Sequence, residues 1–164
     1  MDPMVMDLLK GPAGEQPKQR AVWLKKVHFA CASSSEGSVS QIAEPLAAAI
    51  ALVEKLDGQQ TPDAEKANAE VQLAQYMLHA QGLALFCYLE ELNKMRNTIA
   101  AEVSKQKAGS PERKKGESLQ MAYEMAIDGL ARAYNGLREG RLDELKTIVP
   151  VMEAVRKTAS DLAR

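Results

Sequence analysis

The stretch VQLAQYMLHAQGLALFCYLEELNKMRNTI, residues 71–99, decides the fold of this chain. It carries branched apolar residues at a strict seven-residue spacing, at Val71, Leu78, Leu85, Leu92 and Ile99. Side chains seven residues apart return to nearly the same face of an α-helix, so the stretch predicts a helix that packs along other helices. The chain contains no proline between Asp63 and Ser110, and we expect this helix to run from about residue 61 to about 107, with a bend near Gly82 or Asn93.

Further helices are expected on both sides of this long one. Apolar residues at helical spacing predict them at about residues 17–32, 38–58, 110–139 and 141–164. A strand would also explain the alternation of Val27, Phe29 and Cys31, but no second strand is available to pair with it. Gly58 is expected to end its helix in a left-handed conformation, and Ser110 and Pro111 are expected to begin the next one.

Short links between successive helices favour antiparallel neighbours. The sequence therefore predicts an all-α fold, an up-and-down antiparallel bundle of four to five helices with a long central third helix. This bundle is expected to be a single domain at residues 17–164, long enough to bury a substantial core without a disulfide or a metal. Residues 1–16 are expected to form an N-terminal arm with a short amphipathic helix that begins at Asp2 and Pro3.

Composition and charge make several functions improbable. The 164 residues carry 21 Lys and Arg against 22 Asp and Glu, a net charge of -1, so no global field attracts nucleic acid. No stretch approaches the roughly 20 apolar residues of a membrane span, and the first twelve residues lack the pattern of a secretory signal. The two cysteines are expected to be buried, reduced thiols, so the cytoplasm is the expected location.

The residue types that carry chemistry are sparse. His28, Cys31, His79 and Cys87 are the residue types of a zinc site, but His79 and Cys87 are separated by eight residues, roughly 12 Å along a helix axis. Neither histidine has a glutamate three residues before it, as a di-iron bundle requires, and no glycine-rich phosphate loop is present. We therefore expect no metal, no cofactor and no catalytic constellation.

Two features point instead to binding of a protein partner. The arm presents apolar side chains that must find a groove in their own molecule, in a sister subunit or in another protein. A basic cluster follows at Lys18, Arg20, Lys25 and Lys26, with no acidic residue between Gln16 and Ser35. The candidate partner-binding residues are Met4, Met6, Leu8, Leu9, Trp23, Lys25 and Lys26.

Other charged and methionine residues are assigned to ordinary structural roles. A second basic cluster, at Lys105, Lys107, Arg113, Lys114 and Lys115, is diluted by glutamates and is expected to be a solvated end of the bundle. Most of the eight methionines are expected to fill the core, with an adaptable groove for a partner helix as the alternative. Gly82, Gly116, Gly129 and Gly136 lie within helices, where they permit close helix approach.

The run AYNGLREGRLDEL, residues 133–145, resembles the inter-helix turn of a tetratricopeptide unit, but no second copy follows at the period of about 34 residues that a repeat array requires. In its helical layout the chain is also similar to flagellar and type III export chaperones, a resemblance that implies a chaperone-like role and no particular site residue. The leading hypothesis is a non-enzymatic, protein-binding helical bundle that recognises a partner protein or helical peptide through an apolar groove. The alternatives are a homodimer or other homo-oligomer assembled through the central heptad, and an enzyme that uses Cys31, Cys87 or His79.

Overall fold

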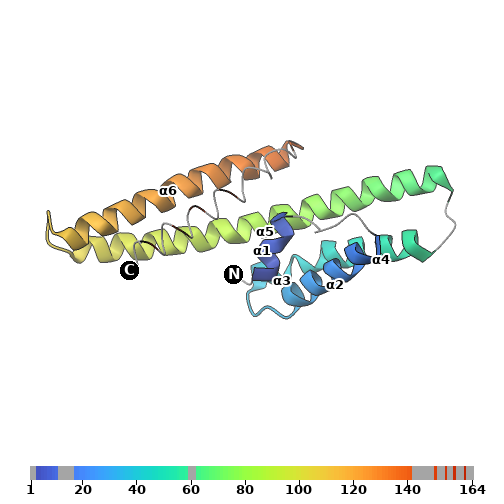
Figure 1. Cartoon of the computed structure of the whole chain (residues 1–164), viewed down its shortest axis with the longest axis horizontal. Coiled ribbons are helices and arrows are strands. Elements are labelled where there is room, and N and C mark those ends of the chain that lie inside the picture. The colour runs from blue at the N-terminus through green and yellow to red at the C-terminus, as the bar shows by residue number, and fades with distance from the viewer. Residues whose placement is uncertain are drawn as a thin grey trace. The chain divides into compact units, whose positions relative to one another are not determined.

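A computed structural model describes residues 3–10, 17–58 and 62–141, together with the single residues Pro150, Ala154, Lys157 and Asp161. Within these residues every regular element is a helix, and the predicted all-α helical bundle is confirmed (Figure 1). The helices are α1 (Pro3–Lys10), α2 (Pro17–Ala32), α3 (Gly37–Ser40), α4 (Ala43–Gly58), α5 (Asp63–Lys105) and α6 (Pro111–Arg138). The four single residues are helical, and the rest of the helix expected at 141–164 lies outside the described residues.

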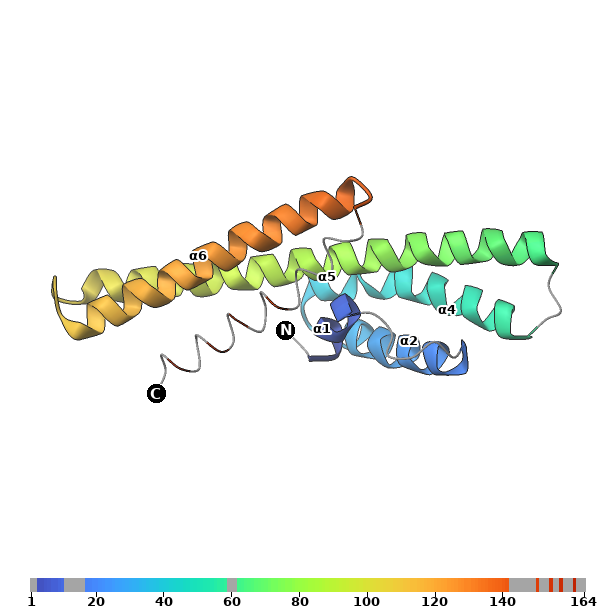
Figure 2. The ribbon, with the colours of Figure 1, turned by 45° about the horizontal axis from the view of Figure 1, so that its top comes forward.

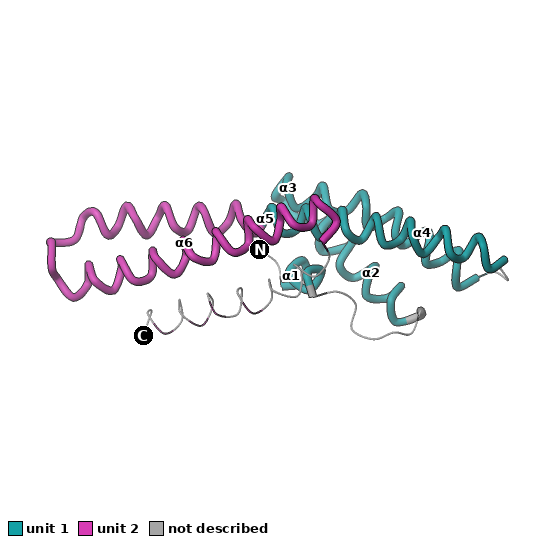
Figure 3. Tube along the Cα trace, turned by 90° about the horizontal axis from the view of Figure 1, so that it is seen from above, with its two compact units in different colours: residues 1–87 teal, residues 88–164 magenta. Residues whose placement is uncertain are grey.

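The chain divides into two compact units, Met1–Cys87 and Tyr88–Arg164, and the boundary between them lies inside α5 (Figure 3). The helix itself is continuous over 43 residues and passes through both Gly82 and Asn93. The expected start of this helix at residue 61 lies outside the described residues. No described helix is long and apolar enough to cross a membrane.

In the first unit, α2 packs against α1, α3 and α4. Figure 2 shows α1 and α4 beside α2. Its buried side chains meet those of α4 in a core of aliphatic residues that includes Leu24, Val27, Leu46 and Val53. The arm belongs to this core, because α1 buries Val5, Leu8 and Leu9. The amide of Gln81 in α5 donates a hydrogen bond of 3.1 Å to the carbonyl oxygen of Leu8, which has no partner further along its own short helix.

The central heptad is only partly buried. Leu85 and Leu92 are buried, and Leu78 and Ile99 are half-buried, as a core-facing stripe requires. Val71 is 58% exposed, so the buried part of the heptad does not extend to this end of the helix. Leu73 faces the core in its place, about 200° from Val71 around the helix.

In the second unit, the end of α5 and α6 form an antiparallel helical hairpin (Figure 3). Its turn contains Gly109 with φ of +77°, and the Ser110 side chain accepts a 3.2 Å hydrogen bond from the backbone N–H of Arg113, with Pro111 at the first helical position. The predicted cap-and-proline start of α6 is therefore confirmed. The spacing of Leu119, Tyr123, Ala126, Leu130, Ala133 and Leu137 predicts one apolar stripe on this helix, and all of these residues are buried except Leu119, which is half-buried.

The glycines at the ends of α4 and α6 differ in conformation, and the expected left-handed cap at Gly58 is wrong. Gly140 has φ of +79° and follows the end of α6. Gly58 is the last residue of α4 and has no positive φ, so it does not form the left-handed cap. A glycine at a helix end allows the left-handed conformation without requiring it.

Candidate partner-binding face of α2

Helix α2 is apolar on two opposite sides, and only one of them is used in the core. Leu24, Val27 and Cys31, spaced by three and four residues, are buried. Val22 and Phe29 lie seven residues apart on the other side and are 55% and 73% exposed. Because residues seven apart share a helix face, these two side chains form an apolar ridge about 10 Å long that no described element covers.

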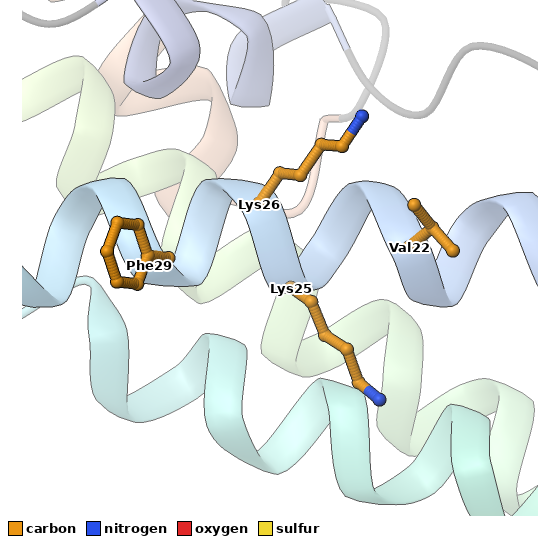
Figure 4. A pocket seen from close by; sticks show the side chains of 4 residues that line it. All are labelled: Val22, Lys25, Lys26 and Phe29. Atoms are coloured by element: carbon orange, nitrogen blue, oxygen red, sulfur yellow. The ribbon is translucent and has the colours of Figure 1, made fainter.

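Two lysines flank this ridge. Figure 4 shows Lys25 and Lys26 leaving α2 in opposite directions, Lys25 toward α4, from the stretch of helix between Val22 and Phe29. The four residues line a shallow open groove whose walls are almost entirely apolar, because the lysines contribute their methylene stems to it. We call these four residues, Val22, Lys25, Lys26 and Phe29, the α2 face.

The charges around the α2 face are distributed unevenly. Lys25 forms an ion pair of 2.5 Å with Glu54 of α4, and both side chains are more than half exposed. Arg20, just before the face, forms hydrogen bonds of 3.1 and 3.4 Å with the carboxylate of Glu70 in α5. Lys26 makes no ion pair with any side chain in the part of the chain that is described. The face therefore carries its unbalanced positive charge on the Lys26 side.

The structure separates the sequence-predicted site residues into two groups. Lys25 and Lys26 lie on the α2 face, and Trp23 is half-buried beside it on the same helix. Leu8 and Leu9 are buried in the first unit, so the groove that the arm needs lies in its own molecule. Met6 is half-buried on the same helix, and the side chain of Met4 lies outside the described residues.

Val22 and Phe29 were missed as site residues, although the sequence contained a signal for them. Both were assigned simply to an apolar helix. The residues Leu24, Val27 and Cys31 already complete one stripe, and a second pair seven residues apart has to lie on a different face. A helix with two apolar stripes and no acidic residue is atypical of a simple amphipathic surface helix, and this combination distinguishes the α2 face as a candidate site.

The residues considered for chemistry are not brought together by the fold. Cys31 and Cys87 are both buried and carry no disulfide, whereas His79 is exposed and His28 is half-buried. Among the described residues, no three His, Cys, Asp or Glu side chains are close enough to hold a metal ion. A thiol-dependent reaction needs a thiolate within reach of its substrate, and neither sulfur is exposed.

The second basic cluster lies where it was expected, whereas three of the methionines do not. Lys105 pairs with Glu102 at 2.7 Å and Arg113 with Glu117 at 2.8 Å, and the remaining lysines of the cluster are exposed, so it is a solvated helix end, as expected. Met121 and Met125 are instead largely exposed on α6, and Met95 is exposed on α5. The expectation that methionines fill the core is wrong for these three residues.

Comparisons with protein-family models, with curated proteins and with solved structures found no match for this chain.

Proposed function

We propose that this chain is a non-enzymatic protein-binding module that takes up a partner protein or helical peptide on the α2 face. One observation carries the proposal. Phe29, the most exposed of the large apolar side chains in the described residues, lies on the same ridge as exposed Val22 and between two lysines. An apolar centre with a polar rim is the usual anatomy of a protein-binding surface.

The two apolar side chains of this face can contribute part of the free energy of binding. Complete burial of a valine or phenylalanine side chain contributes about 1.5–3 kcal/mol each, and a few such anchors dominate most interfaces. The helix that presents them packs in the core through the side chains on its other side. A partner therefore binds a preformed surface and does not have to order it.

Photo-cross-linking tests the proposal directly. A photoreactive phenylalanine analogue replaces Phe29 in the full chain, expressed in the cells that make the protein. The matched control carries the same analogue at Met125, which is similarly exposed on α6. A discrete adduct with another protein from position 29 that is absent from position 125 supports the proposal. Equal adducts from both positions, or none from position 29, contradict it.

The reading as a cytoplasmic adaptor or chaperone-like protein rests on this binding activity. The two buried cysteines without a disulfide fit a reducing compartment. The cross-linking test requires no knowledge of the compartment or of the identity of the partner. Recovery of the partner by co-purification of the unmodified chain and mass spectrometry identifies it.

A homo-oligomer assembled through the central heptad is the second candidate, and the exposure of α5 favours it. Val71 is exposed and Leu78, seven residues later, is half-buried, so part of the heptad is available to a second copy. Sedimentation equilibrium of the wild-type chain and of Val71→Ser tests this candidate. A dimer that Val71→Ser converts to monomer supports it, and a monomer in both cases contradicts it.

A further inference from the structure

We infer that the partner of the α2 face is an acidic amphipathic helix, whose apolar side chains cover Val22 and Phe29 and whose carboxylates lie along the Lys26 side. This inference rests on the proposed function and adds the chemistry of the partner. It follows from the shape of the ridge and from the distribution of charge around it.

The ridge fits a helix better than an extended strand. Val22 and Phe29 are separated by two turns of α2, and the groove that they line with Lys25 and Lys26 is shallow and open. Packing between helices places apolar side chains of one helix into the spaces between residues three, four and seven apart on the other. An extended peptide would instead need unpaired backbone groups on the α2 side, and in the interior of an α-helix those groups are already hydrogen-bonded to each other.

The charge of the ridge selects acidic residues in the partner. Helix α2 carries Lys18, Arg20, Lys25 and Lys26 and no acidic residue over its 16 residues. Of the basic residues beside the groove, Lys25 already has a carboxylate neighbour in Glu54, whereas Lys26 has none among the described residues. A partner carboxylate near Lys26 thus gains an ion pair that costs the chain no existing contact. A partner carboxylate near Lys25 would also lie near Glu54 and be repelled by it.

The same charges argue against two other occupants. A second copy docked antiparallel on this face about a twofold axis would bring one Lys26 close to the other, and like charges at an interface are destabilising. An anionic membrane would meet the exposed carboxylate of Glu54 beside Lys25. Membrane-surface helices also present a much larger continuous apolar face than two side chains.

Trp23 provides the readout for a test. It is the single tryptophan of the chain and is half-buried next to Val22, so its fluorescence reports on this helix alone. The probes are two synthetic helical peptides of about 15 residues, a length at which a helix becomes stable in water. Both carry leucines at helical spacing on one face and neither contains tryptophan. One carries glutamates beside the leucines, and the other carries lysines at the same positions.

Titration of the full chain with each peptide, followed by Trp23 fluorescence, measures the affinity for that peptide. The glutamate peptide is expected to bind about tenfold or more tightly than the lysine peptide, and its affinity is expected to fall with added salt. Lys26→Met keeps the apolar stem and removes the charge, so it is expected to weaken the glutamate peptide about fivefold. Lys26→Glu is expected to reverse the preference between the peptides. Lys114→Met on α6 is the matched control and is expected to change nothing.

The outcomes separate this inference from the proposed function. Equal binding of both peptides, lost in Phe29→Ser, overturns the charge inference and leaves the α2 face as a binding surface. If Phe29→Ser and Val22→Ser leave binding of the glutamate peptide unchanged, the inference is overturned. If, in addition, the cross-linker at position 29 gives no adduct, the proposed function is overturned as well.

Two further arms cover the other occupants. A change in Trp23 fluorescence with protein concentration alone, lost in Phe29→Ser, assigns the face to a second copy and overturns the inference. A change in Trp23 fluorescence with phosphatidylserine vesicles, without any change on addition of the glutamate peptide, also overturns the inference. Because Phe29 and Lys26 are exposed, their variants are expected to unfold at the wild-type temperature, which a thermal scan verifies.

Discussion

A Cβ atom on Gly116 would lie 2.5 Å from Cγ2 of Val103, so α6 approaches α5 there at a distance that only glycine permits. Gly116→Ala is expected to lower the free energy of unfolding by about 1 kcal/mol, because overpacking outweighs the gain in helix propensity. In a Val103→Ala background the new methyl group has room, and the same change is expected to stabilise. Urea unfolding of the four variants measures this coupling. Stabilisation by Gly116→Ala in the wild-type background would contradict the close approach.

Gly82 is the contrasting glycine, because an added Cβ meets no atom within 4 Å. It lies inside the continuous helix α5, so Gly82→Ala is expected to raise the free energy of unfolding by about 1 kcal/mol. Gly109→Ala is the control. Its φ of +77° strains any residue with a Cβ, and a loss of about 1 kcal/mol is expected. Thermal unfolding checks both, and a loss of stability in Gly82→Ala would show that α5 is not a regular helix there.

Ser110 begins α6 by accepting a hydrogen bond from the backbone N–H of Arg113. Ser110→Ala removes this cap and is expected to cost about 1 kcal/mol. Ser118 is a matched control, because its hydroxyl donates to the Lys114 carbonyl in the helix interior and is exposed. Ser118→Ala is expected to be neutral or slightly stabilising. Equal losses in the two variants would rule out a specific capping contribution.

Tyr123 links the stability of the second unit to alkaline pH. Burial raises the pKa of its hydroxyl above the ordinary value of 10.0, and the nearby charge of Glu91 adds to the shift. The folded chain then holds this proton more tightly than the unfolded chain, so stability is full below pH 10 and falls as the pH rises from there toward the folded pKa. Urea unfolding between pH 8 and 11 measures this loss. Tyr123→Phe is expected to show a smaller decline over this range, and an unchanged decline would exclude Tyr123 as its source.

The parts of the fold that were predictable are those with one apolar stripe or a strong cap. Ser110 and Pro111 marked the start of α6 because local hydrogen bonding and the fixed φ of proline act without help from the rest of the chain. The buried stripe of α6 from Tyr123 to Leu137 followed from its spacing alone. The exposure of Val71 was not predictable, because a seven-residue repeat identifies a helix face but does not show what covers that face. Near Leu73 the core lies on the opposite side of α5.

Periodicity does not show what covers a helix face, and this also explains which residues of the candidate site were predictable. Lys25 and Lys26 were identified from the absence of acidic residues, a signal that burial does not alter. Leu8 and Leu9 were chosen because an amphipathic arm needs a groove, and periodicity could not reveal that α2 and α5 provide one. Phe29 was overlooked because an apolar residue in a helix is assigned to the core by default, and only tertiary packing decides between two apolar stripes.

Isothermal titration tests most directly whether the α2 face binds the partner. It measures the affinity of two double variants for the partner that co-purifies with the unmodified chain. Val22→Ser with Phe29→Ser alters the α2 face, and Met121→Ser with Met125→Ser alters an equally exposed apolar pair on α6. We expect about tenfold or greater weakening by the first variant and a change within about twofold by the second. The reverse pattern, or no loss with the first variant, would contradict the assignment of α2 as the binding helix.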